Sequence, residues 1–331
     1  MQDREFTALV VDRKQDQYSH SFQMLKIKDL PEEDVLIRVQ YSSLNYKDGM
    51  AVLNRGKIVR QFPMVPGIDL AGTVVESKNS AFQPGDKVIL TGWGTGETHW
   101  GGYAEYATAK PEWLVPLPSG LQLKHAMSLG TAGLTAMLAV SALERHGINR
   151  KKPILVTGAS GGVGSLAVAI LSRLGYTVAA STGSPDNHEF LKSLGASEII
   201  DRKELSEAPR PLESQRWGGA VDVVGGDTLA HVLSEMSYYG TVAACGLAGN
   251  HSLHTTVYPF ILRGIKLVGI DSNTCPADER TQAWNRLSEL LPAELLDQLT
   301  EVHGLRDVPA LSEKILSGDV KGRIVIDVQQ T

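Results

Sequence analysis

Cysteine is scarce in this sequence, with only Cys245 and Cys275 among 331 residues. Two thiols exclude a disulfide framework and a zinc site built from four cysteines. Free cysteine is among the most buried residue types, so we expect two buried thiols. Basic residues are not in excess either. The chain has 32 Lys and Arg and 37 Asp and Glu, which gives a net charge of -5. Without a broad positive field, nucleic acid is excluded as a partner and an anionic ligand needs a local basic pocket.

Long hydrophobic runs and a leader are also lacking. The chain starts with MQDREF, and no stretch approaches the roughly 18 apolar residues that span a bilayer. We therefore expect a cytoplasmic protein that does not bind membranes. Hydrophobic residues make up 42% of the chain, enough for proper cores. Because single cores stop growing at about 250 to 300 residues, two packed domains are expected.

The first third of the chain alternates short strand-like segments with glycine and proline turns. The sequence Pro84-Gly85-Asp86 is one such turn, in which proline presets φ and glycine supplies the left-handed conformation. The pattern predicts a small barrel-like β domain over residues 1–124, completed by residues 272–331 at the C-terminal end. Its first strands are expected at 8–11, 35–40, 72–75 and 87–90.

The sequence pattern changes near residue 125. An apolar stretch at 126–143 is typical of a helix, and it leads into a β-branched run at 153–156. Strands and helices then alternate, which indicates a parallel sheet with helices on both faces over residues 125–271. Helices are expected from about Ser165 and at 188–194, and a broken helix at 286–299. Strands are expected at 177–181, 198–201, 221–224, 241–244, 265–270 and 322–327.

A glycine-rich segment, TGASGGVG at 157–164, stands between a predicted strand and a predicted helix. A glycine turn there lets backbone N–H groups and the positive helix end approach a pyrophosphate. The spacing departs from the plain GxGxxG pattern, but its position predicts a dinucleotide ligand. At the end of the next strand the sequence STGS at 181–184 offers hydroxyls where NAD enzymes place a carboxylate, and Arg202 can add charge. NADPH is favoured, although Asp186 lies just beyond and keeps NADH open.

Several motifs together resemble the zinc-free YhdH/YhfP branch of the medium-chain dehydrogenases/reductases, which contains acrylyl-CoA reductases historically labelled quinone oxidoreductases. The resemblance covers essentially the whole chain and implies a GroES-like β-barrel catalytic domain plus a Rossmann domain with a doubly wound parallel sheet. Its carriers are YSSLNYKD at 41–48, FPMVPGID at 62–69, GWG at 92–94, HWGG at 99–102, GTAGLTAM at 130–137, AACGLA at 243–248, PFILRG at 259–264 and GR at 322–323.

The same motifs bear on a catalytic metal. Zinc alcohol dehydrogenases of the superfamily carry Cys in the first motif and a His-Glu pair after the proline-glycine, where this chain has Asn45, Asp48 and Ile68-Asp69. Asn and Ile are not ligands of a catalytic zinc site, so no metal is expected. A hydride must then go to an acceptor that needs no metal Lewis acid, such as an enoyl thioester, enone or quinone.

The resemblance implies NADPH-dependent reduction of acryloyl-CoA to propionyl-CoA, with hydride transfer to the β-carbon and protonation at the α-carbon. It assigns catalytic roles to Asn45, Tyr46 and Asp48. Many members have Arg where this chain has Ser184, so the preference for NADPH is expected to be weaker here. The implied cofactor contacts are Tyr46, Ser160, Gly161, Gly162, Val163, Thr182, Gly183, Ser184, Arg202, Leu247, Ile261, Ser272 and Arg323.

Other functions stay open at this point. An NADPH-dependent quinone or enone reductase shares the chemistry and differs only in the acceptor pocket. A non-enzymatic NADPH-binding protein is a third class, against which the intact Asn45, Tyr46 and glycine loop argue. The resemblance also implies a homodimer, because members of that family often pair the last Rossmann strands edge to edge, and the strand at 265–270 is apolar enough to be covered. Lys57 and Arg60 are candidates for CoA phosphates or are simply solvated.

Overall fold

The computed structural model describes residues 3–15 and 17–330, which separate into two compact units. Unit 1 is formed by the described residues up to Thr131 and from Asn273 onward, and unit 2 by Ala132–Ser272. The first boundary falls inside helix α2 (Leu123–His146), one residue after its interruption at Gly130. The sequence pattern places the boundary at 124/125, where the helix begins. The helical period of apolar residues continues across the observed boundary, so the pattern cannot mark it.

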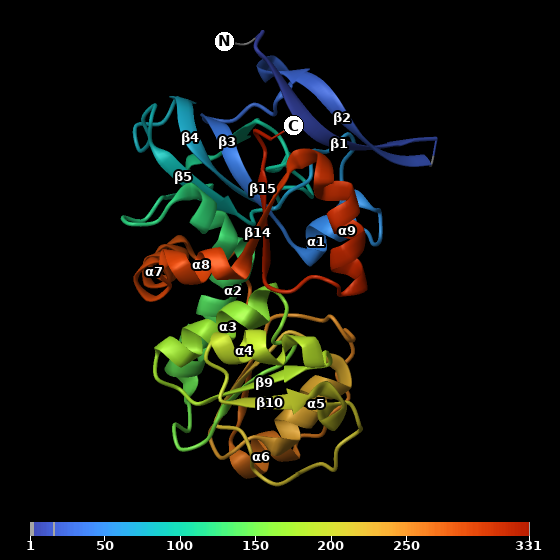
Figure 1. Ribbon diagram of the computed structural model, residues 1–331, viewed down its shortest axis with the longest axis vertical. Coiled ribbons are helices and arrows are strands. Elements are labelled where there is room, and N and C mark those ends of the chain that lie inside the picture. Colours follow the sequence, from blue (N-terminus) through green and yellow to red (C-terminus); the bar gives the residue numbers. More distant parts are fainter. Residues whose placement is uncertain (1–2, 16, 331) are drawn as a thin grey trace. The chain divides into compact units, whose positions relative to one another are not determined.

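Unit 1 is built mostly on antiparallel strands, and only β14 and β15 pair in parallel among the described residues (Figure 1). A hairpin of β1 (Glu5–Lys14) and β2 (Gln17–Lys26) forms one sheet. A seven-stranded sheet has the order β14-β15-β3-β4-β5-β7, with β6 paired to β3. Because β15 pairs with β3, the C-terminal segment completes this sheet. The strands are β3 (Val35–Leu44), β4 (Asp69–Ser77), β5 (Lys87–Thr91), β6 (Tyr106–Ala109), β7 (Leu114–Pro116), β14 (Thr300–Gly304) and β15 (Arg323–Asp327).

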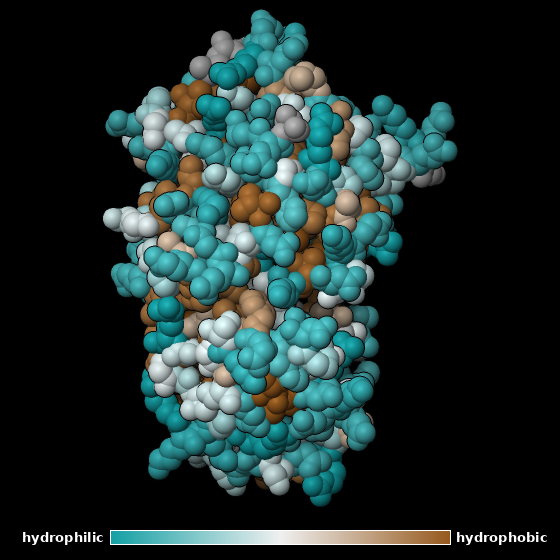
Figure 2. Space-filling model, in the orientation of Figure 1, coloured by the Kyte–Doolittle hydropathy of each residue, from teal (hydrophilic) through white to brown (hydrophobic). Residues whose placement is uncertain are grey.

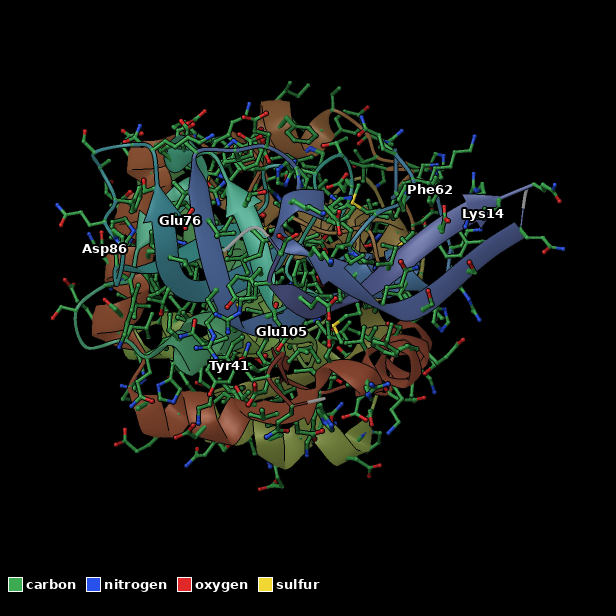
Figure 3. The ribbon with its side chains drawn as sticks, turned by 90° about the horizontal axis from the view of Figure 1, so that it is seen from above. Lys14, Tyr41, Phe62, Glu76, Asp86 and Glu105 are labelled. Carbon is green, nitrogen blue, oxygen red and sulfur yellow. The ribbon has the colours of Figure 1, made fainter. Side chains whose placement is uncertain are left out.

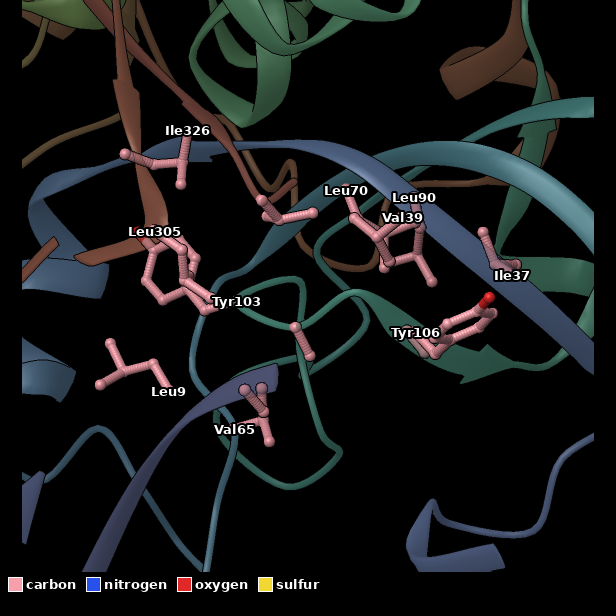
Figure 4. Close-up of a cluster of buried hydrophobic side chains, with 14 of the residues drawn as sticks. Leu9, Ile37, Val39, Val65, Leu70, Leu90, Tyr103, Tyr106, Leu305 and Ile326 are labelled. Atoms are coloured by element: carbon pink, nitrogen blue, oxygen red, sulfur yellow. The ribbon is translucent and has the colours of Figure 1, made fainter. Parts of the chain in front are cut away.

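The core of unit 1 gathers side chains from strands far apart in the sequence (Figure 4). Ile37 and Val39 on β3 are fully buried, and β-branched residues of this kind fit a pleated, packed surface. Burying one such side chain stabilises the fold by about 1.5–3 kcal/mol. Leu305 and Ile326, from the C-terminal part of the chain, belong to the same cluster and hold that part to the N-terminal strands.

Two helices of unit 1 pack closely, α1 (Tyr46–Val52) and α9 (Val308–Ser317). A Cβ on Gly49 would lie 2.9 Å from Ile315 Cγ2, so glycine is what lets the helices approach. The sequence predicted only strands in this first third, which was wrong because a seven-residue helix has too few turns to show a period. The remaining helices of the tail, α7 (Ala277–Leu290) and α8 (Ala293–Leu299), meet at Pro292, and α7 begins nine residues before the predicted 286.

Unit 2 contains the predicted parallel sheet, in the order β10-β9-β8-β11-β12-β13. The order reverses between β8 and β11, the place where open sheets of this type bind ligands. The strands are β8 (Ile154–Val156), β9 (Val178–Thr182), β10 (Glu198–Asp201), β11 (Gly219–Asp222), β12 (Thr241–Ala244) and β13 (Lys266–Gly269). The helices are α3 (Gly162–Arg173), α4 (His188–Ser193), α5 (Gly226–Glu235) and α6 (Tyr258–Arg263).

Two predicted bounds in unit 2 were displaced. Helix α3 begins at Gly162 and not near Ser165, because the glycine segment itself forms the first turn. Strand β11 ends at Asp222 and not at Val224, since the Asp222 side chain starts a turn by accepting a hydrogen bond from the backbone N–H of Gly225 at 2.8 Å.

Helix α2 is long and apolar enough to cross a membrane by length and composition, contrary to the expectation that no stretch would be. Its most apolar window is 89% buried inside the protein, which is the behaviour of a core helix. The helix is interrupted at Gly130, whose φ of 51° and ψ of -153° are not helical.

Candidate active site

The first group of predicted residues lies where β3 ends and α1 begins. Asn45 is the N-cap residue of α1, and Asp48 occupies the first helical turn. Asp48 Oδ2 accepts a hydrogen bond from the backbone N–H of Asn45, and Asp48 Oδ1 accepts one from that of Ile68, each at 2.9 Å. A carboxylate at this position also benefits from the helix dipole. These bonds hold Asp48 inside the protein at 1% exposure, whereas Tyr46 beside it is 50% exposed.

The Asn45 amide joins Asp48 to a second buried acid. Its Nδ2 lies 3.0 Å from Asp48 Oδ2, 2.9 Å from Asp69 Oδ2 and 3.1 Å from Ser43 Oγ. Because an amide has two hydrogens, these three acceptors share it. The amide nitrogen is therefore committed to the two carboxylates, and the Asn45 carbonyl oxygen is the atom left to orient a ligand.

Asp69 was not singled out as a site residue from the sequence, although it stands in the FPMVPGID motif. It is fully buried, at the start of β4. Its carboxylate accepts hydrogen bonds from Ser43 Oγ at 2.6 Å, from Thr131 Oγ1 at 2.5 Å and from the Thr131 backbone N–H at 2.9 Å. Since buried charges are retained only where they are paired and hydrogen-bonded, this donor set keeps an acid beside Asn45.

The environment makes Asp48 a proton-exchanging group near neutral pH. Burial, and after it the charge of Asp69, raise the pKa of Asp48 from 3.8 to about 7, against the opposing effect of the hydrogen bonds from Ile68 and Asn45. Two carboxylates that share one amide donor cannot both ionise without cost. The pair is thus suited to hold a single proton.

A buried cation, Arg323, completes this network. It is 3% exposed, and its Nε donates to the Ser128 carbonyl at 2.9 Å. A Cβ on Gly130 would lie 2.5 Å from Asp69 Oδ2 and 3.2 Å from Arg323 Nη2, so the interruption of α2 makes room for both groups. Burial lowers the pKa of Arg323, and the charges of Asp69 and Asp48 oppose this. Arg323 was predicted as a cofactor contact, and the structure places it within the acidic network of unit 1.

The residues around Asn45 do not fit a catalytic zinc ion. The oxygens of Asp48 and Asp69 are already engaged by N–H and O–H donors, and the Arg323 guanidinium lies in the same network. The catalytic zinc of alcohol dehydrogenases is held by Cys and His ligands, which these positions do not supply. Among the residues that the structure describes, no group of three or more His, Cys, Asp and Glu side chains could hold a metal ion.

The glycine segment of unit 2 has the geometry of a phosphate loop. Gly158 adopts a φ of +56°, and a Cβ on Gly164 would lie 2.3 Å from the Gly158 carbonyl oxygen, so only glycine allows α3 to approach β8 so closely. The N-cap residue, Gly161, makes no side-chain capping bond. The first N–H groups of α3 are therefore open to an anion, which is the fit expected for a pyrophosphate.

Asp222 anchors this loop and was missed from the sequence. Thr157 Oγ1 donates to Asp222 Oδ1 at 2.6 Å, which joins the end of β8 to the end of β11 across the reversal of strand order. Burial raises the pKa of Asp222, and its hydrogen bond from Thr157 opposes the shift. Asp222 lies inside the strand predicted at 221–224, and a carboxylate among the apolar residues of that strand was the available signal.

The turn after β9 brings hydroxyl and basic groups together. Thr182 Oγ1 lies 3.4 Å from Ser160 Oγ and accepts from the Ser184 backbone N–H at 3.3 Å. A Cβ on Gly183 would meet Arg202 Nε at 2.3 Å, so the exposed Arg202 side chain lies against the glycine backbone. With no carboxylate at 182–184 and a guanidinium beside it, this turn fits a ribose 2′-phosphate.

The other predicted contacts of unit 2 are spread more widely. Leu247 is exposed and lines a hollow of about 500 Å³ at the carboxyl ends of β12 and β13. Ile261 on α6 is 68% exposed, and Ser272 Oγ accepts a hydrogen bond from Thr135 Oγ1 at 2.7 Å. Both predicted thiols are free; Cys275 is buried, whereas Cys245 is only half-buried because it lines the same hollow. Burial raises the pKa of the Cys245 thiol to about 12.

The chain matches two family models, the alcohol dehydrogenase GroES-like domain over residues 31–119 and the zinc-binding dehydrogenase over residues 162–289. It is 51% identical over 327 residues to the acrylyl-CoA reductase AcuI of Ruegeria pomeroyi, covering 98% of this chain and 99% of that protein. It is 46% identical over 324 residues to the putative quinone oxidoreductase YhfP of Bacillus subtilis, covering 97% and 98%.

Solved structures agree with these matches. The YhdH oxidoreductase from Salmonella enterica in complex with NADP is 50% identical, with a TM-score of 0.95 over 97% of this chain and 99% of that chain. YhfP from Bacillus subtilis with NAD bound is 44% identical, with a TM-score of 0.94 over 98% and 100%. The predicted fold, a GroES-like domain with a Rossmann domain, is confirmed. The chain belongs to the medium-chain dehydrogenase/reductase superfamily, in the family that includes the acrylyl-CoA reductase AcuI and YhfP.

Proposed function

We propose that this protein is an oxidoreductase that uses NADPH to reduce acryloyl-CoA to propionyl-CoA. The observation that carries the proposal is the buried network of Asn45, Asp48 and Asp69, which lies at the start of the helix that also carries the half-exposed Tyr46. The 51% identity to AcuI over nearly the whole chain supports the same substrate. Reduction of an electrophilic enoyl thioester needs a hydride and a proton. Unlike alcohol oxidation, it needs no metal ion to polarise a hydroxyl group.

The residues of unit 2 fit NADPH by the geometry of their loops. The backbone N–H groups from Ser160 to Val163 would receive the pyrophosphate, and Thr182, Gly183, Ser184 and Arg202 would surround the 2′-phosphate. Leu247, Ile261 and Ser272 in unit 2, with Tyr46 and Arg323 in unit 1, complete the proposed contacts. When bound, NADPH supplies the hydride that the β-carbon of the thioester receives. We infer a modest preference over NADH, because Ser184 provides no guanidinium and YhfP binds NAD.

The roles of the chain's own residues follow from their positions. The Asn45 carbonyl oxygen, set by the bonds of its amide nitrogen to the two acids, orients the nicotinamide carboxamide. The Tyr46 phenol, half-exposed at the start of α1, is assigned the hydrogen bond to the thioester and the delivery of the proton that the α-carbon takes. Asp48 does not reach solvent at 1% exposure, so it acts through Asn45 and the turn that carries Tyr46.

Quinone reduction is the second candidate function, favoured by the 46% identity to YhfP, a putative quinone oxidoreductase. The test is NADPH oxidation with acryloyl-CoA beside a small quinone, repeated with NADH and after chelation. Rapid, chelator-insensitive turnover of the thioester alone, slower with NADH, is the expected result. Turnover of quinone alone would overturn the first candidate and support the second. Binding of NADPH without any turnover would overturn both.

We also propose that the protein acts in the cytoplasm as a homodimer. Strand β13 is a sheet edge in unit 2, pairing with β12 on one side only among the described residues. Its exposed Lys266 and Gly269 flank the half-buried Leu267 and Val268, and an open apolar edge of this kind is normally covered. The edge-to-edge pairing of two β13 strands would cover it.

A further inference from the structure

The loop between α1 and β4 carries positive charge without acid residues. From Gly49 to Ile68 the chain contains Arg55, Lys57 and Arg60 and no Asp or Glu. All three side chains are exposed. Arg55 pairs with Glu313 at 3.2 Å, but neither the Lys57 ammonium nor the Arg60 guanidinium has a hydrogen bond or ion pair among the described residues. In a chain with a net charge of -5, this is a local concentration of free cations.

The loop is held in place at both ends. The Arg55 backbone N–H donates to the Met50 carbonyl, and the Arg60 backbone N–H donates to the Glu97 carbonyl, each at 2.8 Å. The side chains of Lys57 and Arg60 therefore project from a fixed backbone. A positioned cation loses less entropy on binding an anion than one on a free segment.

An aromatic and arginine cluster borders the same loop. The Arg13 guanidinium carbon lies 4.8 Å from the centre of the Phe62 ring and 5.9 Å from that of Tyr18, and Arg13 Nη2 donates to Asn54 Oδ1 at 3.1 Å. Tyr18 donates a hydrogen bond to the Ala51 carbonyl at the end of α1. Figure 3 shows Phe62 beside Lys14 at the end of β1, and Figure 2 shows the projecting end of this hairpin as hydrophilic. Half-exposed rings and guanidinium planes are surfaces on which nucleobases stack.

We propose that Arg13, Lys57, Arg60 and Phe62 form the binding site for the adenosine 3′-phosphate diphosphate end of the CoA substrate. The two free cations receive the phosphates, and adenine stacks on the Phe62 and Arg13 surface. This inference rests on the proposed function, because it assigns the carrier part of the same thioester. It explains how the enzyme tells a CoA thioester from a small enone or quinone, which lacks these charges.

The substitution Lys57→Gln with Arg60→Gln tests the proposal. It should lower kcat/KM for acryloyl-CoA about tenfold, mostly through KM, since two exposed charge-assisted contacts are lost. The kcat/KM for acryloyl-pantetheine, which lacks the nucleotide, should not change. The matched control is Lys78→Gln with Lys87→Gln, which removes the same charge next to Glu76 and Asp86, residues that Figure 3 labels on the side of the view away from Phe62. It should change neither value. Equal effects on both thioesters, or none, would overturn the proposal.

A binding measurement separates this site from the reaction. Adenosine 3′,5′-bisphosphate is titrated calorimetrically into protein saturated with NADP⁺, so that the dinucleotide site is closed to it. Binding that is lost in Lys57→Gln with Arg60→Gln and kept in the control supports the site even if acryloyl-CoA is not reduced, which would sink only the proposed function. Absence of binding to the unaltered protein, or equal binding by both variants, would overturn the site even if acryloyl-CoA is reduced.

Discussion

Opposing electrostatic effects act on the single residues of the acidic network formed by Asp48 and Asp69. Asp48 and Asp69 are both fully enclosed, and both contact the Asn45 amide nitrogen. Desolvation and like charge disfavour ionisation of Asp48, while the surrounding N–H and O–H donors and Arg323 favour charge in the network as a whole. The protonation of this pair therefore depends on pH.

The pH dependence of stability follows from that proton. The unfolded chain releases the Asp48 proton near the ordinary pKa of 3.8, whereas the native chain keeps it up to about pH 7. Between these values the native state binds more protons, so its stability falls as the pH rises. We expect the unfolding free energy of the unaltered protein, relative to Asp48→Asn, to drop by roughly 4 kcal/mol across this window and to level off above it. Urea unfolding at a series of pH values measures this, and parallel curves for the two proteins would contradict it.

Arg202 should decide between the two nicotinamide cofactors. Its guanidinium lies against Gly183 in the turn proposed to hold the 2′-phosphate. The substitution Arg202→Gln should raise KM for NADPH about tenfold and leave KM for NADH unchanged, because only NADPH carries the phosphate. Lys203→Gln, at the neighbouring exposed position, is the control and should alter neither. A comparable loss with both cofactors would show that Arg202 does not read the phosphate.

Residues of the site were predictable where they stand in one motif. Asn45, Tyr46 and Asp48 are close together in sequence, whereas Asp69 meets Ser43 across 26 positions and Thr131 across 62. Only the folded chain brings those donors together. Likewise, Asp222 is tied to Thr157 across 65 positions, and no local pattern announces such a bond.

Among the elements, helix α2 owes its interruption to Gly130. The residue has a positive φ, and a side chain there would overlap Asp69 and approach Ser43 Oγ at 3.0 Å. The helix therefore bends where the acidic network needs space. A change at this position affects the element and the network together.

The substitution Gly130→Ala has two costs, the strain of a positive φ and the overlap with Asp69, and a second glycine allows them to be separated. Gly120 has a φ of +84°, and a Cβ added there would have nothing within 4 Å, so Gly120→Ala reports the backbone cost only, about 1 kcal/mol. Gly130→Ala adds the overlap with Asp69 and should cost about 3 kcal/mol or more. Denaturant midpoints of both variants test this. Equal destabilisation would mean that the network moves aside freely.

Strands and helices were predictable from sequence where their pattern was strong. The parallel strands β8, β9 and β12 are short apolar runs, which are typical of a sheet covered on both faces. Strand β2 was missed because its sequence, QYSHSFQMLK, is mostly exposed and shows no buried face. Helices α1 and α9 were missed because tertiary packing, with Gly49 against Ile315, stabilises them more than their own periodicity.

At the scale of the whole molecule, the proposed homodimer depends on the edge of the unit 2 sheet. The backbone N–H groups of Lys266 and Ile270 point toward β12. They donate to the carbonyls of Gly240, just before β12, and of Ala244, its last residue. Because direction alternates along a strand, the Leu267 and Gly269 N–H groups face the open edge. An added strand would bond to these groups.

This alternation gives a selective test of the dimer. Sedimentation should give twice the 35.7 kDa mass of one chain for the unaltered protein and for Leu267→Ala. Leu267→Pro removes an N–H that only the edge uses, so it should yield a monomer with its β12 pairing intact. A monomer for the unaltered protein would refute the homodimer, and a dimer for Leu267→Pro would place the interface elsewhere.

The central claim, hydride delivery to an enoyl thioester, is tested most directly by isotope tracing. Acryloyl-CoA is reduced with NADPH that carries deuterium at the transferable position of nicotinamide C4, and the product is examined by NMR. The account predicts propionyl-CoA with one deuterium at the β-carbon and with solvent hydrogen at the α-carbon. Deuterium at the α-carbon, or consumption of NADPH without any labelled propionyl-CoA, would contradict it.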